Sequence, residues 1–318
     1  MHPLVVEETI DDLLRETFSV ILRDGSPVTT TRGPSRELVG ASLELLDPRS
    51  RLSRTESRRR SRTGIAELCW YLSGTTDPSM ITHWVPNYEK EIETAGPAAG
   101  TIRGAYGPRM FGSGRDAQFD TVQRLLADNP TSRRAVIQLF DATDLTGQRF
   151  KDVPCTTTIQ FLCRDEQLHV IVTMRSNDAY VGLPLDVFTF TMLQELMAGE
   201  LGVGVGRYIH TVGSLHIYED TEQQIEEYLG EGWQSTDSPM PSMPAGSMSE
   251  HVPRFTTAGE HLVAGHRYEA LVLPEDAYWA DLVRMLALKS ARERDPEEAR
   301  AITAAIEAQY FREFIKRG

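Results

Sequence analysis

Residues 152–186 read DVPCTTTIQFLCRDEQLHVIVTMRSNDAYVGLPLD, and this stretch decides the fold. It contains two runs rich in β-branched and aromatic residues, TTTIQFLC from Thr156 and QLHVIVTM from Gln167, separated by the turn residues R-D-E. This pattern predicts an antiparallel β-hairpin. Residues 186–201 then repeat apolar side chains at helical spacing, which predicts a long amphipathic helix after the hairpin.

Periodic patterns on both sides of the hairpin predict the remaining elements. The apolar run GIAELCWYLSG (64–74) predicts a helix that ends at Gly74. Asp295 is placed to cap a C-terminal helix that Pro296 opens. Its apolar face repeats every fourth residue and comprises Ile302, Ile306, Tyr310 and Phe314. With a further helix over 6–22 and strands over 134–140 and 207–218, the sequence predicts a single α+β domain over residues 1–318.

The composition narrows the classes of function. The 318 residues have a formal net charge of −13, which argues against broad binding to nucleic acids or anionic membranes, since both require a positive field. No apolar run approaches the length of a membrane span, and the N-terminus turns acidic too early for a signal peptide. Cys69, Cys155 and Cys163 cannot all pair and lack metal-ligand spacing. We therefore expect a reduced, cytoplasmic protein that binds no metal.

Two features leave alternatives open. Six arginines interleaved with serines occupy residues 51–62, which is typical either of a solvated loop or of a basic rim for an anionic ligand. Glu67 lies inside the apolar helix over 64–74. It is either the solvent-facing residue of that helix or a partly buried carboxyl with a raised pKa, and the residue types alone favour the first.

Cys155 is a candidate nucleophile. A single cysteine beside a strand is more often a small core residue, but the hairpin ends in Arg175 close to it. A nearby permanent cation lowers the pKa of a thiol, and a guanidinium also holds phosphate through paired hydrogen bonds. Arg133 and Arg134 form a second pair that could bind phosphate, although paired arginines are common on surfaces.

Several short motifs together resemble the thymidylate synthase family, which includes the cytidylate and deoxycytidylate hydroxymethylases. They occur in the family's order between Arg32 and Tyr218. They are TRG (31–33), AELCWYLSGTTD (66–77), AYGPR (105–109), SRR (132–134), PC (154–155), RSND (175–178), GLP (182–184) and HTVGSLHIY (210–218). The resemblance implies an α+β fold with a large mixed β-sheet flanked by helices, one sheet face forming a homodimer interface.

The resemblance also implies roles for individual residues at the reacting ring. Cys155 would be the nucleophile and Glu67 the carboxyl that organises water and proton transfers. Tyr106 and Trp84 would line the reaction centre. Asp178, together with Trp84 and Gly182, would contact 5,10-methylenetetrahydrofolate, the one-carbon donor.

A second set of residues would hold the nucleotide. Arg32, Arg175 and Ser176 would bind its phosphate. Arg133 and Arg134 would reach that phosphate from the other subunit of an obligate homodimer. His216 and Tyr218 would bind the 3′-hydroxyl of the sugar. The partners implied are therefore a pyrimidine nucleoside monophosphate, a folate and a second copy of the chain.

Asp186 departs from the thymidylate synthases, which have at this position an asparagine that reads the edge of uracil. A carboxylate with one shared proton complements cytosine instead, since it accepts from the 4-amino group and donates to nitrogen 3. An acid near a helix N-terminus is also stabilised by the helix dipole, whatever its role. Within this motif we favour the base-reading role.

The sequence thus favours a hydroxymethylase that converts CMP or dCMP with methylenetetrahydrofolate and water. The composition, rich in Arg and Ala, favours the nucleoside-antibiotic branch of such enzymes. Three further departures agree with altered chemistry, namely Met174 for a glutamine, Thr156 for a histidine and Ser214 for an acid. The alternatives are a divergent thymidylate synthase that methylates dUMP, or a non-catalytic relative that binds nucleotides or RNA.

Overall fold

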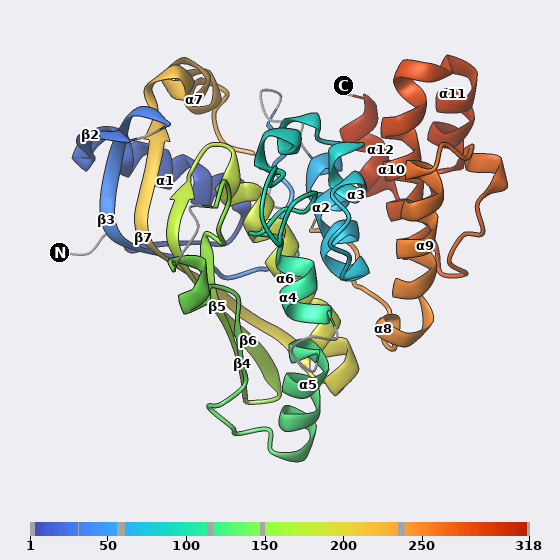
Figure 1. Ribbon diagram of the computed structural model, residues 1–318, viewed down its shortest axis with the longest axis horizontal. Helices are drawn as coiled ribbons and strands as arrows, with labels where there is room; N and C mark the ends of the chain where they lie inside the picture. Colours follow the sequence, from blue (N-terminus) through green and yellow to red (C-terminus); the bar gives the residue numbers. More distant parts are fainter. Residues whose placement is uncertain are drawn as a thin grey trace.

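The computed structural model describes residues 4–30, 32–55, 61–112, 117–146, 150–234 and 239–316 (Figure 1). These residues form seven strands in one mixed sheet. The strands are β1 (Leu4–Glu7), β2 (Ser26–Thr30), β3 (Gly33–Leu45), β4 (Val136–Gln138), β5 (Thr156–Arg164), β6 (Gln167–Asp178) and β7 (Gly204–Tyr218). The spatial order is β1-β3-β7-β6-β5-β4, with β2 paired to β3. The predicted α+β class with a large mixed sheet flanked by helices is confirmed.

The predicted hairpin forms the middle of this sheet. β5 and β6 pair antiparallel from Thr156 opposite Met174 to Arg164 opposite Gln167. β6 continues through residues 175–178 and pairs parallel with β7, so its last residues lie beside the end of β7. The strand predicted over 134–140 is shorter than expected, since only Val136–Gln138 pair with β5.

The helices cover one face of the sheet in successive layers. They are α1 (Ile10–Asp24), α2 (Ser61–Ser73), α3 (Ser79–Thr82), α4 (Tyr106–Phe111), α5 (Gln118–Asp128), α6 (Gly182–Leu201), α7 (Glu222–Gly230), α8 (Ser247–Glu250), α9 (Val252–Val263), α10 (Ala277–Arg294), α11 (Pro296–Ala305) and α12 (Gln309–Lys316). α6 packs on β6 and β7, α2 packs on α6, and α9 and α10 pack on α2 (Figure 1). None of the helices in the described ranges is both long and apolar enough to cross a membrane.

α6 is a central helix and not the amphipathic one that we predicted. Its side chains are buried around its whole circumference, since the sheet covers one side and α2 the other. The helix also begins at Gly182, four residues before the predicted start. Just before the helix, Oδ1 of Asp178 accepts hydrogen bonds from the backbone N–H groups of Tyr180 and Val181, which fixes the turn that leads into α6.

The chain termini also differ from the prediction. Residues Leu4–Glu7 form a strand beside β3, so the N-terminal helix begins only at Ile10. At the other end the predicted single helix is broken between Ala305 and Gln309. The carboxylate of Asp281, fully buried on α10, accepts hydrogen bonds from the backbone N–H groups of Glu307 and Ala308, which turns the chain there.

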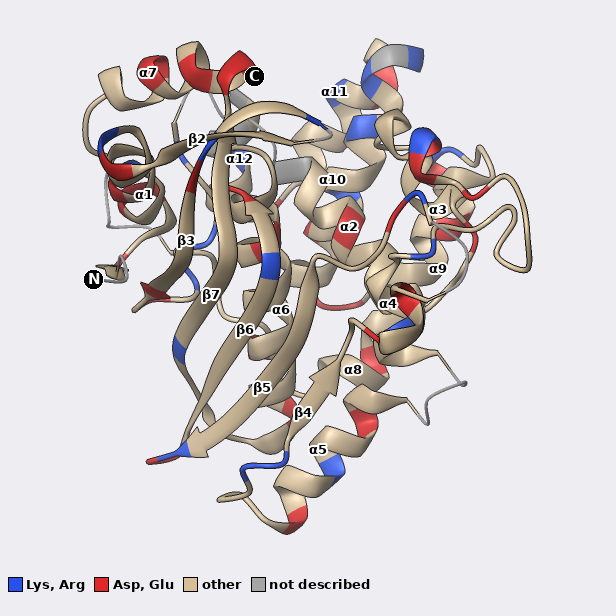
Figure 2. Ribbon diagram, turned by 60° about the vertical axis from the view of Figure 1, so that its left-hand side comes forward, with Lys and Arg blue, Asp and Glu red and all other residues tan. Residues whose placement is uncertain are grey.

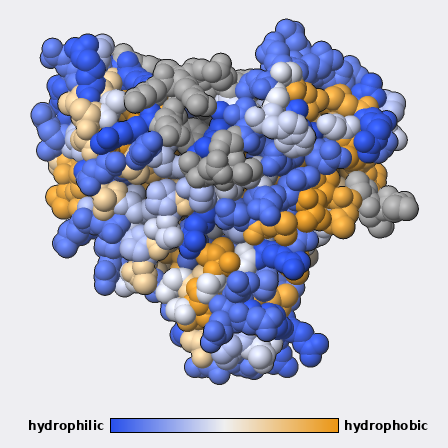
Figure 3. Space-filling view, turned by 180° about the vertical axis from the view of Figure 1, so that it is seen from behind, coloured by the Kyte–Doolittle hydropathy of each residue, from blue (hydrophilic) through white to orange (hydrophobic). Residues whose placement is uncertain are grey.

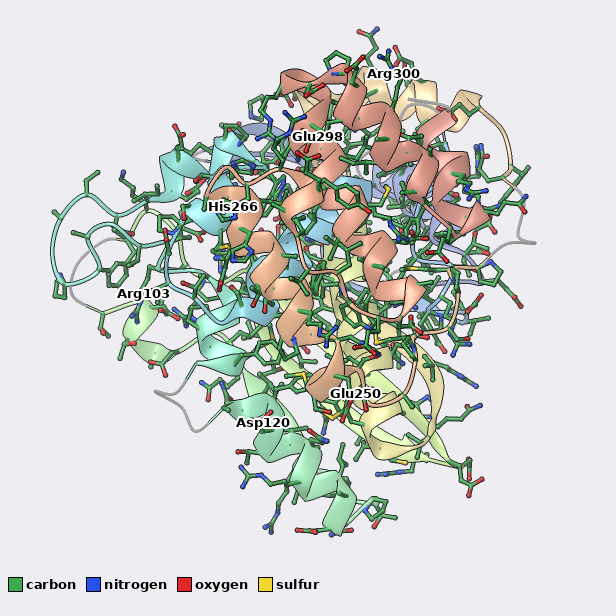
Figure 4. The ribbon with its side chains drawn as sticks, turned by 90° about the vertical axis from the view of Figure 1, so that its right-hand side faces the viewer. Arg103, Asp120, Glu250, His266, Glu298 and Arg300 are labelled. Atoms are coloured by element: carbon green, nitrogen blue, oxygen red, sulfur yellow. The ribbon has the colours of Figure 1, made fainter. Side chains whose placement is uncertain are left out.

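The remaining features of the C-terminal helix are confirmed as far as the structure describes them. Asp295 caps α11 by accepting from the backbone N–H groups of Glu297 and Glu298. Ile302, Ile306 and Tyr310 are buried, whereas the side chain of Phe314 lies outside the described residues. Figure 4 shows Glu298 of α11 next to the loop that carries His266. There its Oε1 accepts from the backbone N–H of Tyr268 at 2.8 Å.

The arginine-rich segment is only partly described, and residues 56–60 lie outside the described ranges. Arg51 does not belong to a basic rim, because its side chain is completely buried and pairs with Glu195 of α6. Arg49 donates to the same carboxylate at 2.7 Å. The start of this segment therefore anchors the chain to the central helix.

Among the residues that the structure describes, no helix covers the second face of the sheet (Figure 2). Figure 2 shows β3 to β7 with this face toward the viewer. Its side chains include half-buried Ile171 and Ile209 and the more exposed Leu4 and Val6 of β1. Figure 3, which shows the molecule from behind, has a further group of apolar side chains on its right-hand side.

Candidate active site

Cys155 lies directly before β5, and the neighbouring strand places Arg175 over it. The backbone N–H of Arg175 donates to the Cys155 carbonyl at 2.8 Å. Its guanidinium donates through Nε to the Pro154 carbonyl at 2.9 Å and through Nη2 to the Val153 carbonyl at 3.1 Å. Nη2 lies 3.6 Å from the Cys155 sulfur. The hairpin thus holds a fixed cation against the thiol, as predicted.

The expected lowering of the thiol pKa is wrong for the protein without substrate. Burial raises the pKa of Cys155, and the positive charge of Arg175 only partly offsets this. Asp152 and Asp186 add negative charge nearby, which raises the pKa further. The sulfur is therefore protonated at neutral pH until a group accepts its proton.

Glu67 is buried, so the solvent-facing position that the residue types favoured is wrong. α2 packs against α6 on one side and against α9 and α10 on the other, and the side chain of Glu67 is therefore only 5% exposed. Tyr88 donates its hydroxyl to Glu67 Oε1 at 2.9 Å. Burial raises the pKa of this carboxyl to about 7, although Tyr88 and the charge of Lys289 both oppose the shift.

The raised pKa predicts how replacement of Glu67 by glutamine changes stability with pH. Between the ordinary value of 4.5 and about 7, the native state keeps a proton that the unfolded state has released. The contribution of Glu67 is therefore fully present below pH 4.5 and is lost as pH rises through 7, by about 3 kcal/mol in all. Urea unfolding of both proteins across this range should show Glu67→Gln gaining stability relative to wild type. A difference that does not change with pH would contradict the buried, protonated state.

Asp186 lies in the second turn of α6, half-buried near the same group of side chains. Its Oδ2 accepts a hydrogen bond from Nδ2 of Asn177 at 2.8 Å. Burial and the charge of Glu67 raise the pKa of Asp186 well above its usual range, against the lowering effect of Asn177. Two carboxyl groups that repel each other's charge thus face one site, and both hold a proton far more readily than ordinary acids.

Tyr106 links α4 to the nucleophile strand. Its hydroxyl oxygen accepts hydrogen bonds from the backbone N–H and from Oγ1 of Thr156, both at 3.0 Å. The charges of Cys155 and Asp186 both act to raise the pKa of this phenol, although burial is the largest cause. The structure therefore places Tyr106 beside Cys155, as predicted.

The predicted phosphate-binding residues divide into two groups. Arg32 is exposed and forms an ion pair with Glu91 at 3.4 Å. Its positive charge acts to lower the pKa of the Cys155 thiol, as does that of Arg175. Arg133 and Arg134 are exposed at the start of β4, beyond the level of Gln160, whose Nε2 donates to the Arg133 carbonyl at 3.0 Å. The five residues from Cys155 to Gln160 along the strand span roughly 16 Å. The side chains of Arg133 and Arg134 therefore do not join the site of their own chain.

The ends of β6 and β7 bring four further predicted residues together. Asp178 pairs with His216 in the parallel register, and the rings of His216 and Tyr218 meet edge to face at 5.0 Å. Ser176 lies opposite Ser214 in the same register. Gly182 leaves room at this point, because a Cβ there would lie 2.9 Å from Asn177 Nδ2.

Trp84 lies deeper than predicted. It is 3% exposed and points toward α9, where a Cβ on Gly259 would lie 3.8 Å from its ring. Its indole Nε1 has no hydrogen-bond partner among the described residues. Within the same residues, no three His, Cys, Asp or Glu side chains are grouped to hold a metal ion.

Sequence analysis missed four residues of this site. Tyr88 contacts Glu67 from a 3-10 turn over Pro86–Glu91, and no motif marked it. Asp152 is half-buried beside Arg32 and Arg175, and its pKa is raised to about 6 by burial and by Glu91. Asn177 and His210 stood inside recognised motifs, but we assigned them no role because their partners lie on other elements.

Comparison with known proteins supports the resemblance. A family model described as thymidylate synthase matches residues 48–257. The chain is 30% identical over 190 residues to a probable thymidylate synthase of Escherichia phage T5, covering 55% of this chain and 67% of that protein. It is 27% identical over 176 residues to a thymidylate synthase of Francisella philomiragia, covering 52% and 64% respectively.

A thymidylate synthase of Listeria innocua is 29% identical over 170 residues, covering 50% of this chain and 53% of that protein. The matched segments thus span about half to two thirds of the length of these relatives. Cys155, Glu67 and Asp186 lie within the region that the family model matches.

Proposed function

The chain belongs to the thymidylate synthase family, and we propose that it hydroxymethylates carbon 5 of a cytidine monophosphate with methylenetetrahydrofolate and water. The substrate is CMP or dCMP, and the products are the 5-hydroxymethyl nucleotide and tetrahydrofolate. Membership of this family supports the coarser activity, a folate-dependent one-carbon transfer to a pyrimidine nucleotide. The choice of cytosine as the base and the final addition of water go beyond what family membership supports, and they are what we propose.

Asp186 is the observation that supports cytosine. Burial and the charge of Glu67 raise the pKa of this carboxyl well above its usual range, which favours the protonated form with one O–H donor and one acceptor oxygen. Cytosine offers an acceptor at nitrogen 3 and a donor at the 4-amino group, which matches this pair. The asparagine that thymidylate synthases have here presents the complement of uracil instead. The acid is therefore the feature that supports our proposal of a cytidylate hydroxymethylase.

The chain's own residues supply the covalent and proton-transfer steps. The Cys155 sulfur forms a bond to ring carbon 6, and the electron pair of the double bond moves toward carbon 5, which becomes the nucleophile. Asp186, donating to nitrogen 3, stabilises the negative charge that this addition places on the ring. Glu67, with a pKa of about 7, gains and loses protons readily near neutral pH. Loss of the Cys155 sulfur at the end restores the aromatic ring.

Asp178 and Trp84 are suited to hold the folate. Oδ1 of Asp178 is occupied by two backbone N–H groups, whereas no hydrogen bond within the described residues reaches its Oδ2. That oxygen fits a ring N–H donor. With Gly182 beside Asp178, these residues would hold methylenetetrahydrofolate, which supplies the one-carbon unit when bound.

The uncovered sheet face supports a homodimer. Exposed apolar side chains such as Leu4 and Val6 favour burial against a second copy, and Arg133 and Arg134 lie too far from Cys155 of their own chain to bind its nucleotide. In a homodimer they would complete the site of the partner subunit. Cytoplasmic localisation and a single catalytic domain over residues 1–318 remain part of the proposal.

Mixing two inactive variants tests this shared site. Cys155→Ala chains lack the nucleophile, and Arg133→Ala/Arg134→Ala chains lack the donated phosphate ligands. After subunit exchange, half of the dimers are mixed and each has one intact site, so about a quarter of the wild-type activity should return. Activity that stays at the level of the separate variants would contradict the shared site.

A second candidate function is methylation of dUMP, which the names of the relatives favour. The folate product separates the two, because hydride transfer leaves dihydrofolate and water addition leaves tetrahydrofolate. Turnover of CMP or dCMP that forms only tetrahydrofolate is expected, as followed by chromatography of the folates. Dihydrofolate formed with dUMP, together with no turnover of either cytidylate, would overturn the proposal.

A further inference from the structure

Four side chains form a buried hydrogen-bonded chain that ends at Asp186. The Tyr208 hydroxyl lies 2.8 Å from His210 Nδ1, His210 Nε2 lies 3.2 Å from Asn177 Oδ1, and Asn177 Nδ2 lies 2.8 Å from Asp186 Oδ2. Tyr208 and His210 are fully buried and Asn177 is 4% exposed. We propose that Tyr208, acting through His210 and Asn177, fixes which oxygen of Asp186 bears the proton and thereby the base that the site accepts. The proposal rests on the proposed function of Asp186.

The fold explains how residues so far apart in the sequence are joined in this series of hydrogen bonds. Tyr208 and His210 are two positions apart on β7, so both point to the helix-covered face of the sheet. Asn177 stands near the end of the adjacent strand β6, and Asp186 follows on α6, which packs on both strands. Gly182 gives the Asn177 amide its space, since any side chain there would collide with Nδ2.

Tyr208 sets the direction of every hydrogen bond in the chain. Burial raises the pKa of this phenol well above its usual range, so it keeps its proton. A buried hydroxyl proton needs an acceptor, and within the described residues the phenol bonds only to His210. Tyr208 therefore donates to Nδ1 of His210.

The neutral imidazole transmits this direction. Burial lowers the pKa of His210 to about 3, so the ring has a single N–H. Because Nδ1 accepts from Tyr208, the ring proton is on Nε2 and donates to Asn177 Oδ1. The amide is thereby oriented with its NH₂ group toward Asp186 Oδ2.

The orientation of the Asn177 amide decides which oxygen of Asp186 is the hydrogen-bond donor to the base and which is the acceptor. A neutral carboxyl with no other partner could exchange its donor and acceptor oxygens, and would then complement cytosine or uracil equally well. With Oδ2 already accepting from Asn177, the proton is placed on Oδ1. Tyr208, His210 and Asn177 are thus positioning residues for base selection, although none of them touches the base.

Tyr208→Phe is the variant that tests this role, because it removes only the hydroxyl. Without that donor, His210 can place its proton on either nitrogen and the Asn177 amide can turn over. We expect the ratio of kcat/KM for the cytidylate over the uridylate to fall about tenfold. Tyr228→Phe is the matched control, since it removes another fully buried hydroxyl, one that donates to Asp11. It should leave the ratio unchanged even if it lowers stability.

The histidine tautomer gives a readout that needs no substrate, and in the wild type it needs no variant either. ¹⁵N NMR of the histidine-labelled protein should show His210 with its proton on Nε2 in the wild type, and as a mixture of the two neutral tautomers in Tyr208→Phe. A wild-type His210 protonated on Nδ1, or a ratio that does not change in Tyr208→Phe, would overturn the proposal. If the wild type instead used only dUMP, the proposed function would fail, whereas the tautomer would still test the hydrogen-bonded chain by itself.

Discussion

Replacement of Asp186 by asparagine is expected to reverse the base preference from cytosine to uracil nucleotides. The carboxyl of Asp186 donates to nitrogen 3 and accepts from the 4-amino group of cytosine. The amide of the variant would instead accept at position 3 and donate at position 4, which matches uracil. Each mismatched buried group costs about 1–3 kcal/mol, so two of them amount to about 2–6 kcal/mol, or at least about 30-fold in relative kcat/KM. Competition between a cytidylate and dUMP in one reaction measures this ratio directly.

Asp178→Asn is the appropriate control for this change. It removes a nearby carboxylate that accepts from the backbone N–H groups of Tyr180 and Val181, and whose charge is the smallest of the causes that raise the pKa of Asp186. We expect weaker use of folate with either base and an unchanged ratio between them. A preference for cytosine that survives in Asp186→Asn would refute the assignment of base reading to this residue.

Cys155→Ala is expected to lower turnover by about 10⁴-fold or more, because it removes the sulfur that forms the bond to carbon 6. Arg32 and Arg175 remain in the variant, so nucleotide binding should change only a few-fold. Single-turnover kinetics together with binding of the nucleotide monitored by calorimetry separate the two effects.

The same variant distinguishes an enzyme from a non-catalytic binder. A wild-type protein without turnover whose nucleotide affinity matches that of Cys155→Ala would favour the binder. Residual activity within tenfold of wild type would exclude Cys155 as the nucleophile. The position of Arg175, 3.6 Å from the sulfur and pinned by two carbonyl groups, supports the catalytic role.

The hairpin and the contact between Arg175 and Cys155 were predictable, since alternation within each strand and the short turn fix which residues are neighbours. The burial of Glu67 was not, because it depends on helices α6, α9 and α10 that pack around α2 from distant parts of the chain. α6 failed the amphipathic prediction for the same reason. Local periodicity describes one face of an element and says nothing of whether a second layer covers the other.

Contacts between polar groups that are distant along the chain could not be predicted from sequence patterns either. Asp281 ends the predicted C-terminal helix through two backbone N–H groups about 26 residues away along the chain. The link from His210 to Asn177 joins residues 33 positions apart. Motifs marked the segments that contain these residues, but only the folded structure pairs them.

The mass of the product most directly tests whether this chain is a cytidylate hydroxymethylase. The protein is incubated in parallel with CMP, dCMP and dUMP, each with methylenetetrahydrofolate and ¹⁸O-labelled water, and the nucleotides are analysed by mass spectrometry. We expect a cytidylate product heavier by one CH₂O unit whose oxygen comes from the labelled solvent. A product heavier by one CH₂ unit, formed from dUMP while both cytidylates remain unchanged, would contradict it.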